Sequence, residues 1–278
     1  MNRIAFIKAA LEEDIRDGDH SALACIPSDA YGKAVLKVKQ NGVIAGIDVA
    51  KDIFTLVEPE MKFHQLLNDG DCVKVGQTAF EIEASVHTIL KTERLVLNIM
   101  QRMSGIASLT SLYTQKIKNY TTKILDTRKT TPNFRWFEKQ AVLMGGGFNH
   151  RMGLYDMIML KDNHIDYCGG IEKAIDRTIQ YLKEKELDLS IEVETRTLDD
   201  VRRVVAHGGV HRIMFDNFSC KDIKEALSIV NRQYETEASG GITLDTIEEY
   251  AATGVDYISV GAIIHHAVSM DLSLKAVI

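Results

Sequence analysis

Residues 190–216 read SIEVETRTLDDVRRVVAHGGVHRIMFD and hold two short apolar runs on either side of a helical segment. Residues 190–193 and 212–215 are predicted to be strands, and residues 198–206 between them are predicted to be a helix. The loops that join these segments are short. A strand, a helix and a second strand connected in this way are typical of a βαβ unit in a parallel sheet.

The same alternation extends outward in both directions, from residue 123 to residue 260. It predicts six strands, at residues 123–127, 157–160, 190–193, 212–215, 234–238 and 257–260. The predicted helices lie near Glu138 and at residues 172–185, 198–206, 222–232 and 244–252. Six units favour an open, incomplete α/β barrel over a closed eightfold one, although a doubly wound open sheet would show the same alternation.

The residues before this region predict a small α+β unit. Its first helix is indicated by apolar residues at helical spacing, which are Ile4, Ile7, Leu11 and Ile15. Short β-like runs follow, with one helix at residues 47–57 among them, at residues 34–40, 43–46 and 79–84. Residues 87–118 are predicted to form a long helical stretch that bridges two domains and is broken or bent near Ser104 and Gly105.

The composition is that of an ordinary globular protein and narrows the function classes. Of 278 residues, 45% are hydrophobic, 26% are charged and only three are proline, which excludes a disordered chain and a disulfide scaffold. A net charge of −6 argues against a nucleic-acid or membrane-surface partner. We expect a cytoplasmic protein, because no signal peptide or apolar span is visible. Its widely spaced cysteines predict reduced thiols: Cys25, Cys72, Cys168 and Cys220.

Polar residues gather where the predicted strands end, which is where parallel α/β folds place their active sites. The basic ones come from three neighbouring loops of an otherwise acidic chain: Arg128, Lys129, His150, Arg151 and Lys161. Any one of them could be a solvated loop residue. Their convergence favours a ligand that carries carboxylate and phosphate groups.

The later strands end in carboxylates and small residues. Glu194 and Asp216 could accept hydrogen bonds from sugar hydroxyls, hold Mg²⁺ through water, or form structural ion pairs. After the last two strands, small residues would let backbone N–H groups approach a phosphate, at Ser239, Gly240, Gly241 and Gly261. Ordinary turn chemistry is the alternative for these glycines.

Several common catalytic motifs are missing from the sequence. The run Gly145-Gly146-Gly147 lacks the G-x-G-x-x-G spacing of dinucleotide binders. The histidines do not make a zinc pattern, and neither a P-loop nor a G-x-S-x-G motif occurs. Zinc hydrolases, P-loop enzymes and serine hydrolases are therefore not expected.

Seven ordered motifs resemble the quinolinate phosphoribosyltransferase family, also called nicotinate-nucleotide pyrophosphorylase (carboxylating). The similarity extends from Leu11 to Leu274. The motifs are DTRKTTP at 126–132, GGGFNHRMGLYD at 145–156, LKDNH at 160–164, IEVE at 191–194, FDN at 215–217, EASGGI at 237–242 and ISVG at 258–261.

The resemblance implies an N-terminal α+β sandwich domain, residues 1–106, and an open α/β barrel of seven strands, residues 107–270. The tail at 271–278 would pack on the first domain, and the seventh strand would lie near Phe148. It also implies a dimer or larger homo-oligomer that converts quinolinate and phosphoribosyl pyrophosphate, with Mg²⁺, to nicotinate mononucleotide, pyrophosphate and carbon dioxide.

Residue roles follow from the same resemblance. Arg128, His150 and Arg151 would bind the two quinolinate carboxylates, with Lys129 and Lys161 between quinolinate and the phosphoribosyl group. Arg94 would reach into the site of a neighbouring subunit. Glu194 and Asp216 would face the ribose and the metal–pyrophosphate. The 5′-phosphate would be held by Ser239, Gly240, Gly241, Gly261 and His265.

Two positions depart from the family pattern. Asn133 stands where relatives have glycine, a mild change because asparagine tolerates left-handed backbone. The second histidine of the pair His265-His266 replaces a serine and has no assigned role.

Three other functions remain open on the residues alone. A paralogue could use another acceptor, such as nicotinate without decarboxylation, although the retained Arg128, His150 and Arg151 favour a dicarboxylate. Lys161 at a strand end could form a Schiff base in an aldolase-like lyase. A silent ligand-binding protein is the third alternative.

Overall fold

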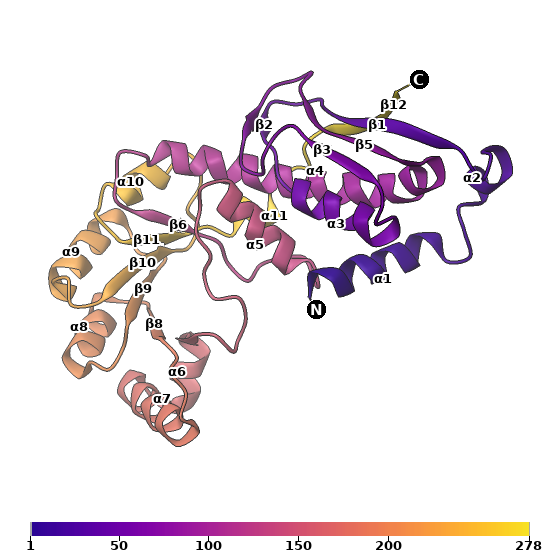
Figure 1. Ribbon diagram of the computed structural model, residues 1–278. Coiled ribbons are helices and arrows are strands. Elements are labelled where there is room, and N and C mark those ends of the chain that lie inside the picture. Colours follow the sequence, from indigo (N-terminus) through magenta and orange to yellow (C-terminus); the bar gives the residue numbers. More distant parts are fainter. Residues whose placement is uncertain (1, 278) are drawn as a thin grey trace. The chain divides into compact units, whose positions relative to one another are not determined.

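The computed structural model describes residues 2–277, which form two compact units (Figure 1). The first unit contains Met1–Ser111, Thr130–Gly146 and Ile263–Ile278, and the second contains Leu112–Lys129 and Gly147–Ala262. The first holds an antiparallel sheet and the second a parallel, barrel-like one, which confirms the predicted fold class. The domain boundary at residue 106 stays a prediction.

The first unit is built on a four-stranded antiparallel sheet in the order β12-β1-β5-β3. In the inner strand β1, Leu36 pairs with Phe80 of β5 on one side and with Leu274 of β12 on the other. Because side chains alternate along a strand, Ala34, Leu36 and Val38 share one buried face. The strands are β1 (Tyr31–Val38), β3 (Lys62–Gln65), β5 (Thr78–Ser85) and β12 (Leu272–Val277), with a separate pair, β2 (Gly42–Val43) and β4 (Cys72–Val73).

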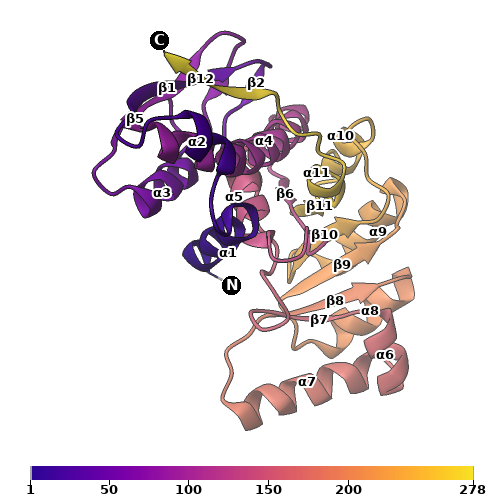
Figure 2. The ribbon, with the colours of Figure 1, turned by 90° about the vertical axis from the view of Figure 1, so that its right-hand side faces the viewer.

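Helices α3 and α4 lie along one face of this sheet (Figures 1 and 2). The ring of Phe54 on α3 meets that of Phe80 on β5 edge-on, with 6.2 Å between centroids, and both side chains are fully buried. The helices of this unit are α1 (Arg3–Ile15), α2 (His20–Cys25), α3 (Ile47–Val57), α4 (Val86–Lys116, which continues into the second unit), α5 (Arg135–Met144) and α11 (Ala262–His265).

Helix α4 is one continuous helix through Ser104 and Gly105, so a break there is wrong, and a bend stays a prediction. Gly105 meets a different need. A Cβ at this position would lie 2.1 Å from the carbonyl oxygen of Val268, so only glycine allows the later segment to approach so closely. The glycine marks a close contact and not a helix end.

The second unit is a six-stranded parallel sheet in the order β6-β11-β10-β9-β8-β7. All six predicted strands are present, with ends that differ by one or two residues. Their apolar side chains are buried, as Val193, Ile213 and Ala238 illustrate. The strands are β6 (Lys123–Leu125), β7 (Ile158–Leu160), β8 (Ile191–Thr195), β9 (Arg212–Asp216), β10 (Glu235–Ser239) and β11 (Tyr257–Ser259).

The barrel is open, because β6 and β7 are the two edges of the sheet formed by the described residues. Outside β6, Phe148 forms an isolated parallel bridge with Leu125. Two hydrogen bonds hold it, from the Phe148 N–H to Ile124 at 2.8 Å and from the Asp126 N–H to Phe148 at 3.0 Å. The seventh strand expected near Phe148 is thus reduced to one bridging residue.

Helices follow the strands of this sheet, and α7 packs on α8, which packs on α9 (Figure 1). Short polar side chains begin two of them: Thr197 accepts the Asp200 N–H at 3.1 Å, and Ser219 accepts the Asp222 N–H at 3.2 Å. The helices are α6 (Asp162–Cys168), which the sequence did not predict, α7 (Ile171–Lys185), α8 (Leu198–His207), α9 (Cys220–Val230) and α10 (Ile247–Ala251).

None of the helices formed by residues 2–277 is long and apolar enough to cross a membrane.

Candidate active site

Charged side chains occupy one face of three adjacent strands in the second unit. Glu192 on β8 pairs in register with Arg212 on β9, which pairs with Glu235 on β10. Two residues further along the same strands, Glu194 is opposite Met214, which is opposite Glu237. Since side chains two apart point to the same side of a sheet, these charges face one another.

At the carboxyl ends of the strands, Lys161 and Glu194 form an ion pair. The Lys161 Nζ lies 3.2 Å from the Glu194 Oε2, and the carboxylate side chain is only 9% exposed. Asp216 lies at the end of the next strand, where burial raises the pKa of its carboxyl group and the negative charge of Glu194 raises it further. The predicted residues Lys161, Glu194 and Asp216 therefore form one group.

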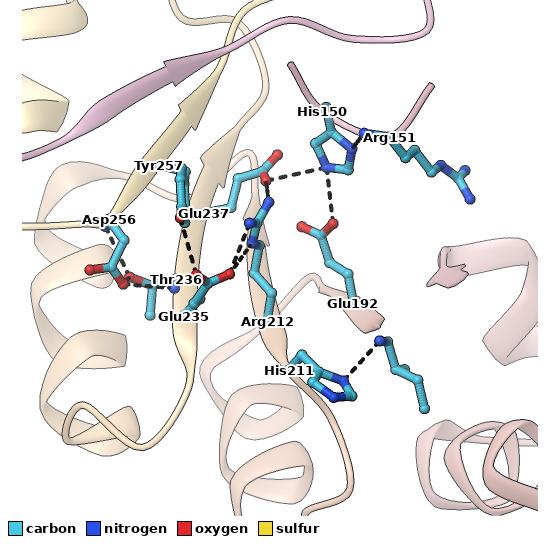
Figure 3. Close-up of polar contacts among 11 residues, drawn as sticks. His150, Arg151, Glu192, His211, Arg212, Glu235, Thr236, Glu237, Asp256 and Tyr257 are labelled. Carbon is cyan, nitrogen blue, oxygen red and sulfur yellow. Dashed lines mark hydrogen bonds and ion pairs between the residues drawn. The ribbon is translucent and has the colours of Figure 1, made fainter. Parts of the chain in front are cut away.

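The His150 side chain is turned toward the sheet and held at both ring nitrogens (Figure 3). Its Nε2 lies 3.0 Å from the Glu192 Oε2 and 3.3 Å from the Glu237 Oε2. Its Nδ1 accepts the backbone N–H of Arg151 at 2.7 Å. Both carboxylate side chains are 0% exposed, and the imidazole is 5% exposed.

These three groups affect one another's pKa values. Burial lowers the pKa of His150, but hydrogen bonds to Glu192 and Glu237 outweigh it and raise that pKa. Burial and the charge of Glu237 raise the pKa of Glu192 to about 7. An imidazolium would carry a proton on Nδ1, where the Arg151 N–H already donates. We therefore place the ring hydrogen on Nε2, on the side of the two carboxylates.

Arg212 anchors the far side of this group. Its Nη1 lies 3.1 Å from the Glu237 Oε2, and its Nη2 lies 2.8 Å from the Glu235 Oε2. The guanidinium also lies over the ring of Tyr257, 4.1 Å from the centroid, and the Tyr257 hydroxyl donates to Glu235 at 3.1 Å (Figure 3). We call His150, Glu192, Arg212 and Glu237 the buried charge cluster.

Two arginines lie beside the cluster. The Arg151 side chain extends away from it (Figure 3). Its Nη1 donates to the carbonyl of Met157 at 3.1 Å. Burial lowers the pKa of Arg151, and the positive charge of Arg128 lowers it further, so the two guanidinium groups are close enough to repel each other. Arg128 and Lys129 are exposed. This part of the site has an excess of positive charge.

The small residues after β10 lie beside β9. Ser239 pairs in register with Asp216. A Cβ on Gly240, whose φ is +99°, would lie 2.2 Å from the Asn217 Oδ1, so a side chain is excluded there by Asn217 itself. Gly241 is exposed and has open space around its Cα, and Gly261 follows the neighbouring strand β11.

Two predicted site residues, Arg94 and His265, lie in the first unit. Arg94 is an exposed residue of α4. His265 is exposed at the end of α11, and its ring meets that of His266 at 88° with 4.3 Å between centroids. In the same unit Asn133 has a φ of +62°, the left-handed conformation for which asparagine is suited.

The sequence prediction overlooked Glu192, Arg212 and Glu237. Only strand ends were searched, and these residues lie within strands. The available signal was charge at every second position, as in the Glu192-Val193-Glu194 triplet.

Two groups of side chains could hold a metal ion. His150, Glu192 and Glu237 offer three ligand atoms within 4.8 Å of one another. The contacts of His150 with Glu192 and Glu237, at 3.0 and 3.3 Å, already account for the short distances in that group. Glu194 and Asp216 suit a hard divalent cation better, because both offer oxygen and a cation would offset the burial and the negative charge of Glu194 that raise the pKa of Asp216.

Comparison with known proteins relates the whole chain to one family. Models described as quinolinate phosphoribosyl transferase, N-terminal domain and C-terminal domain, match residues 19–104 and 106–275. "Quinolinate phosphoribosyltransferase [decarboxylating] 2b, mitochondrial" of Nicotiana tabacum is 44% identical over 97% of this chain and 80% of its own length. "Nicotinate-nucleotide pyrophosphorylase [carboxylating], chloroplastic" of Arabidopsis thaliana is 42% identical over 98% and 82%.

A solved structure agrees with these relatives. The crystal structure of NadC from Streptococcus pyogenes superposes with a TM-score of 0.92 at 39% sequence identity. The match covers 99% of this chain and 96% of that one.

Proposed function

The chain belongs to the quinolinate phosphoribosyl transferase family, and from this membership we propose how its residues carry out the family's reaction. Its activity is the decarboxylating phosphoribosyl transfer to quinolinate in NAD biosynthesis. Quinolinate and phosphoribosyl pyrophosphate become nicotinate mononucleotide, pyrophosphate and carbon dioxide.

The observation that carries the residue assignment is the pair of guanidinium groups. Arg128 and Arg151 repel each other in the absence of an anion, and each can grip a carboxylate with two parallel hydrogen bonds. A dicarboxylate relieves that repulsion. Arg128, His150 and Arg151 thus form the quinolinate side of the site.

The donor side consists of the groups at the ends of β7 to β11. Lys129 and Lys161 would lie between the two substrates, and Glu194 would hold Lys161 in place through their 3.2 Å contact. The 5′-phosphate would meet backbone N–H groups and a hydroxyl at Ser239, Gly240, Gly241 and Gly261, together with His265. Arg94 would complete the site of a partner subunit in a homodimer or larger assembly.

Glu194 and Asp216 fit Mg²⁺, held directly or through water. When bound, the ion would neutralise charge on the departing pyrophosphate. Lys161 would add positive charge to the same leaving group.

The reaction needs orientation more than covalent catalysis. The pyridine nitrogen forms a bond to the anomeric carbon as the bond from that carbon to the pyrophosphate oxygen breaks. The ribosylated nitrogen is cationic, so it stabilises the electron pair that stays on the neighbouring ring carbon as the bond to the 2-carboxylate breaks and carbon dioxide leaves. The ring carbon then takes up a proton. Arg128 and Arg151 would fix the ring first, which reduces the entropic part of the barrier.

A direct test is a coupled assay with quinolinate, phosphoribosyl pyrophosphate and Mg²⁺. We expect nicotinate mononucleotide, pyrophosphate and carbon dioxide in equal amounts. Nicotinate, assayed beside quinolinate, should be a poor acceptor; efficient use of nicotinate without carbon dioxide would assign the chain to another acceptor. Borohydride should trap no adduct on Lys161, whose ammonium is paired with Glu194.

The residue roles can be tested with two variants. Lys129→Ala and Arg151→Ala should lower turnover severely while unfolding stays cooperative. Carbon dioxide release close to that of the unaltered protein by either folded variant would remove that residue from the site.

We also propose that the protein works in the cytoplasm, where its four free cysteines would stay reduced. The names of the two plant relatives assign them to the mitochondrion and the chloroplast. Fluorescence microscopy of the tagged chain in its own cell would decide between these compartments. The division into residues 1–106 and 107–270 is likewise a proposal, and limited proteolysis tests it.

A further inference from the structure

The buried charge cluster contains two carboxylates with no role in the assignments above. Glu192 and Glu237 lie beneath His150, at 3.0 and 3.3 Å from its Nε2. A carboxylate removed from water costs several kcal/mol unless it is paired. Two of them at one imidazole therefore need an explanation beyond packing.

The cluster holds His150 from every side. Besides the two ring contacts, the His150 backbone N–H donates to the buried Asp126 at 2.8 Å. Glu237 cannot move freely either, because Arg212 binds it at 3.1 Å. The ring orientation is consequently set by the sheet and not by solvent.

The ring in turn holds Arg151. Its Nδ1 accepts the Arg151 backbone N–H at 2.7 Å, and the Arg151 guanidinium is fixed at its other end by the Met157 carbonyl at 3.1 Å. The negative charge of Glu192 also acts on that guanidinium and opposes the repulsion from Arg128. Backbone geometry and charge both link the two carboxylates to Arg151.

We propose that Glu192 and Glu237 are positioning residues for the acceptor substrate, because they hold the His150 ring so that Arg151 is preorganised to bind a ring carboxylate. His150 then acts chiefly as a connector between the sheet and Arg151. The proposal rests on the proposed function, since it assigns Arg151 to quinolinate. Preorganisation of this kind lowers the entropy that is lost when the substrate binds. Its loss is therefore expected to change KM more than kcat.

The first test uses Glu237→Gln and Glu192→Gln, which keep side-chain size. Each should raise the KM for quinolinate about tenfold or more, with the KM for phosphoribosyl pyrophosphate and kcat changed less than about threefold. Glu237→Asp should lie between the unaltered protein and Glu237→Gln. The matched control is Glu235→Gln, because Glu235 binds the same Arg212 from an exposed position; its quinolinate KM should change less than about twofold.

A double-mutant cycle separates positioning from general stability. Each single variant, His150→Asn and Glu192→Gln, raises the quinolinate KM by some factor. If the carboxylates act through the ring, the factor for the double variant should be at least about fivefold smaller than the product of the two single factors. Effects that simply multiply would overturn the proposal. So would glutamine variants that lower Tm but leave both KM values unchanged. Glu192→Gln keeps the cycle measurable if Glu237→Gln does not fold.

An NMR experiment on the ligand-free protein tests the geometry without any assay. The His150 ring should show hydrogen on Nε2 and an accepting Nδ1, and Glu192→Gln should shift the Nε2–H resonance. Hydrogen on Nδ1, whether alone or together with hydrogen on Nε2, would refute the proposal. If the protein did not use quinolinate, the assay would reject the proposed function while the NMR result still decided the role of the carboxylates.

Discussion

The buried charge cluster and the outer surface of α7 to α9 both contain ion pairs, yet the two regions differ in what those pairs can do. Contact distances are alike: Arg212 to Glu237 is 3.1 Å, and Arg202 to Glu225 on the surface is also 3.1 Å. Exposure separates them. The Glu237 side chain is 0% exposed, whereas those of Arg202 and Glu225 are 53% and 50% exposed.

Exposure decides the energetics of each pair. Surface ion pairs contribute roughly 0–1 kcal/mol, because water screens the charges and the long side chains lose freedom. Removing one partner of a buried pair costs about 3–5 kcal/mol, because the other charge stays out of water without compensation. Removing one member of the cluster should therefore lower the free energy of unfolding strongly. Apolar residues could fill the same positions in a protein that did not need charge there.

The largest effect should come from Arg212→Met, which leaves Glu237 and Glu192 without their cation. We expect the free energy of unfolding to fall by about 3–5 kcal/mol, measured by denaturant titration. Arg202→Met on the surface is the control and should change it by less than about 1 kcal/mol. Equal losses for the two variants would mean that burial does not distinguish the regions.

Lys161→Met removes an ion pair of intermediate burial, since the side chain of Lys161 is 47% exposed while that of its partner Glu194 is 9% exposed. Loss of one charge that stabilises a leaving group should reduce kcat by about 10²–10³-fold, with a small change in stability. Steady-state kinetics and thermal unfolding measure the two. The exposed Lys185→Met on α7 should leave kcat unchanged, and a kcat for Lys161→Met within about threefold of the unaltered protein would contradict the prediction.

Thr197→Ala tests whether helix capping stabilises the outer surface of α7 to α9 more than its ion pairs do. The Thr197 hydroxyl accepts the Asp200 N–H at the start of α8. Its loss should lower the free energy of unfolding by about 1 kcal/mol, more than the loss of any single ion pair on that surface. Thr197→Ser should restore most of it, and a smaller loss for Thr197→Ala than for Arg202→Met would reverse this order.

The smallest effect concerns pH. Arg203 binds Glu172 at 2.6 Å and lowers the pKa of that carboxyl group from 4.5 to about 2. A depressed pKa in the folded state adds stability that is complete above pH 4.5 and is lost as the pH falls toward 2. Both side chains are 41% exposed, so screening should limit the gain to about 1 kcal/mol or less.

The measurement compares the unaltered protein with Arg203→Leu at several pH values. The difference in their free energies of unfolding should be present at pH 5 and should shrink as the pH falls from about 4.5 to 2. A difference that stays constant over this range would show that Arg203 acts through packing and not through charge.

The parallel sheet could be predicted from the sequence because each strand is a short apolar run between turn residues. Residues 190–216 already contain the repeating unit, and its strands β8 and β9 differ from the predicted ones only at their ends. Strand β12 could not be predicted, because nothing near Leu274 indicates that its partner is Leu36. Pairing across such a distance is set by tertiary packing.

For the site, the sequence was informative where position along a strand alone identifies a residue. Lys161, Glu194 and Asp216 follow from the rule that active sites lie at the carboxyl ends of parallel strands. Predicting a role for Glu192 and Glu237 would have required the register between strands, because the register decides which residue lies opposite a charged residue inside a strand. The orientation of the His150 ring depends on those same carboxylates and could not be predicted for the same reason.

The pairing of β12 with β1 has a consequence for how the chain is made. Lys33, near the start of β1, pairs with Val277, so β1 is synthesised long before the strand that pairs with one of its edges. Until then the β1 edge offers unpaired backbone groups to other nascent chains. The first unit is therefore begun before the second and completed after it, and until β12 is made its open edge favours aggregation with other chains.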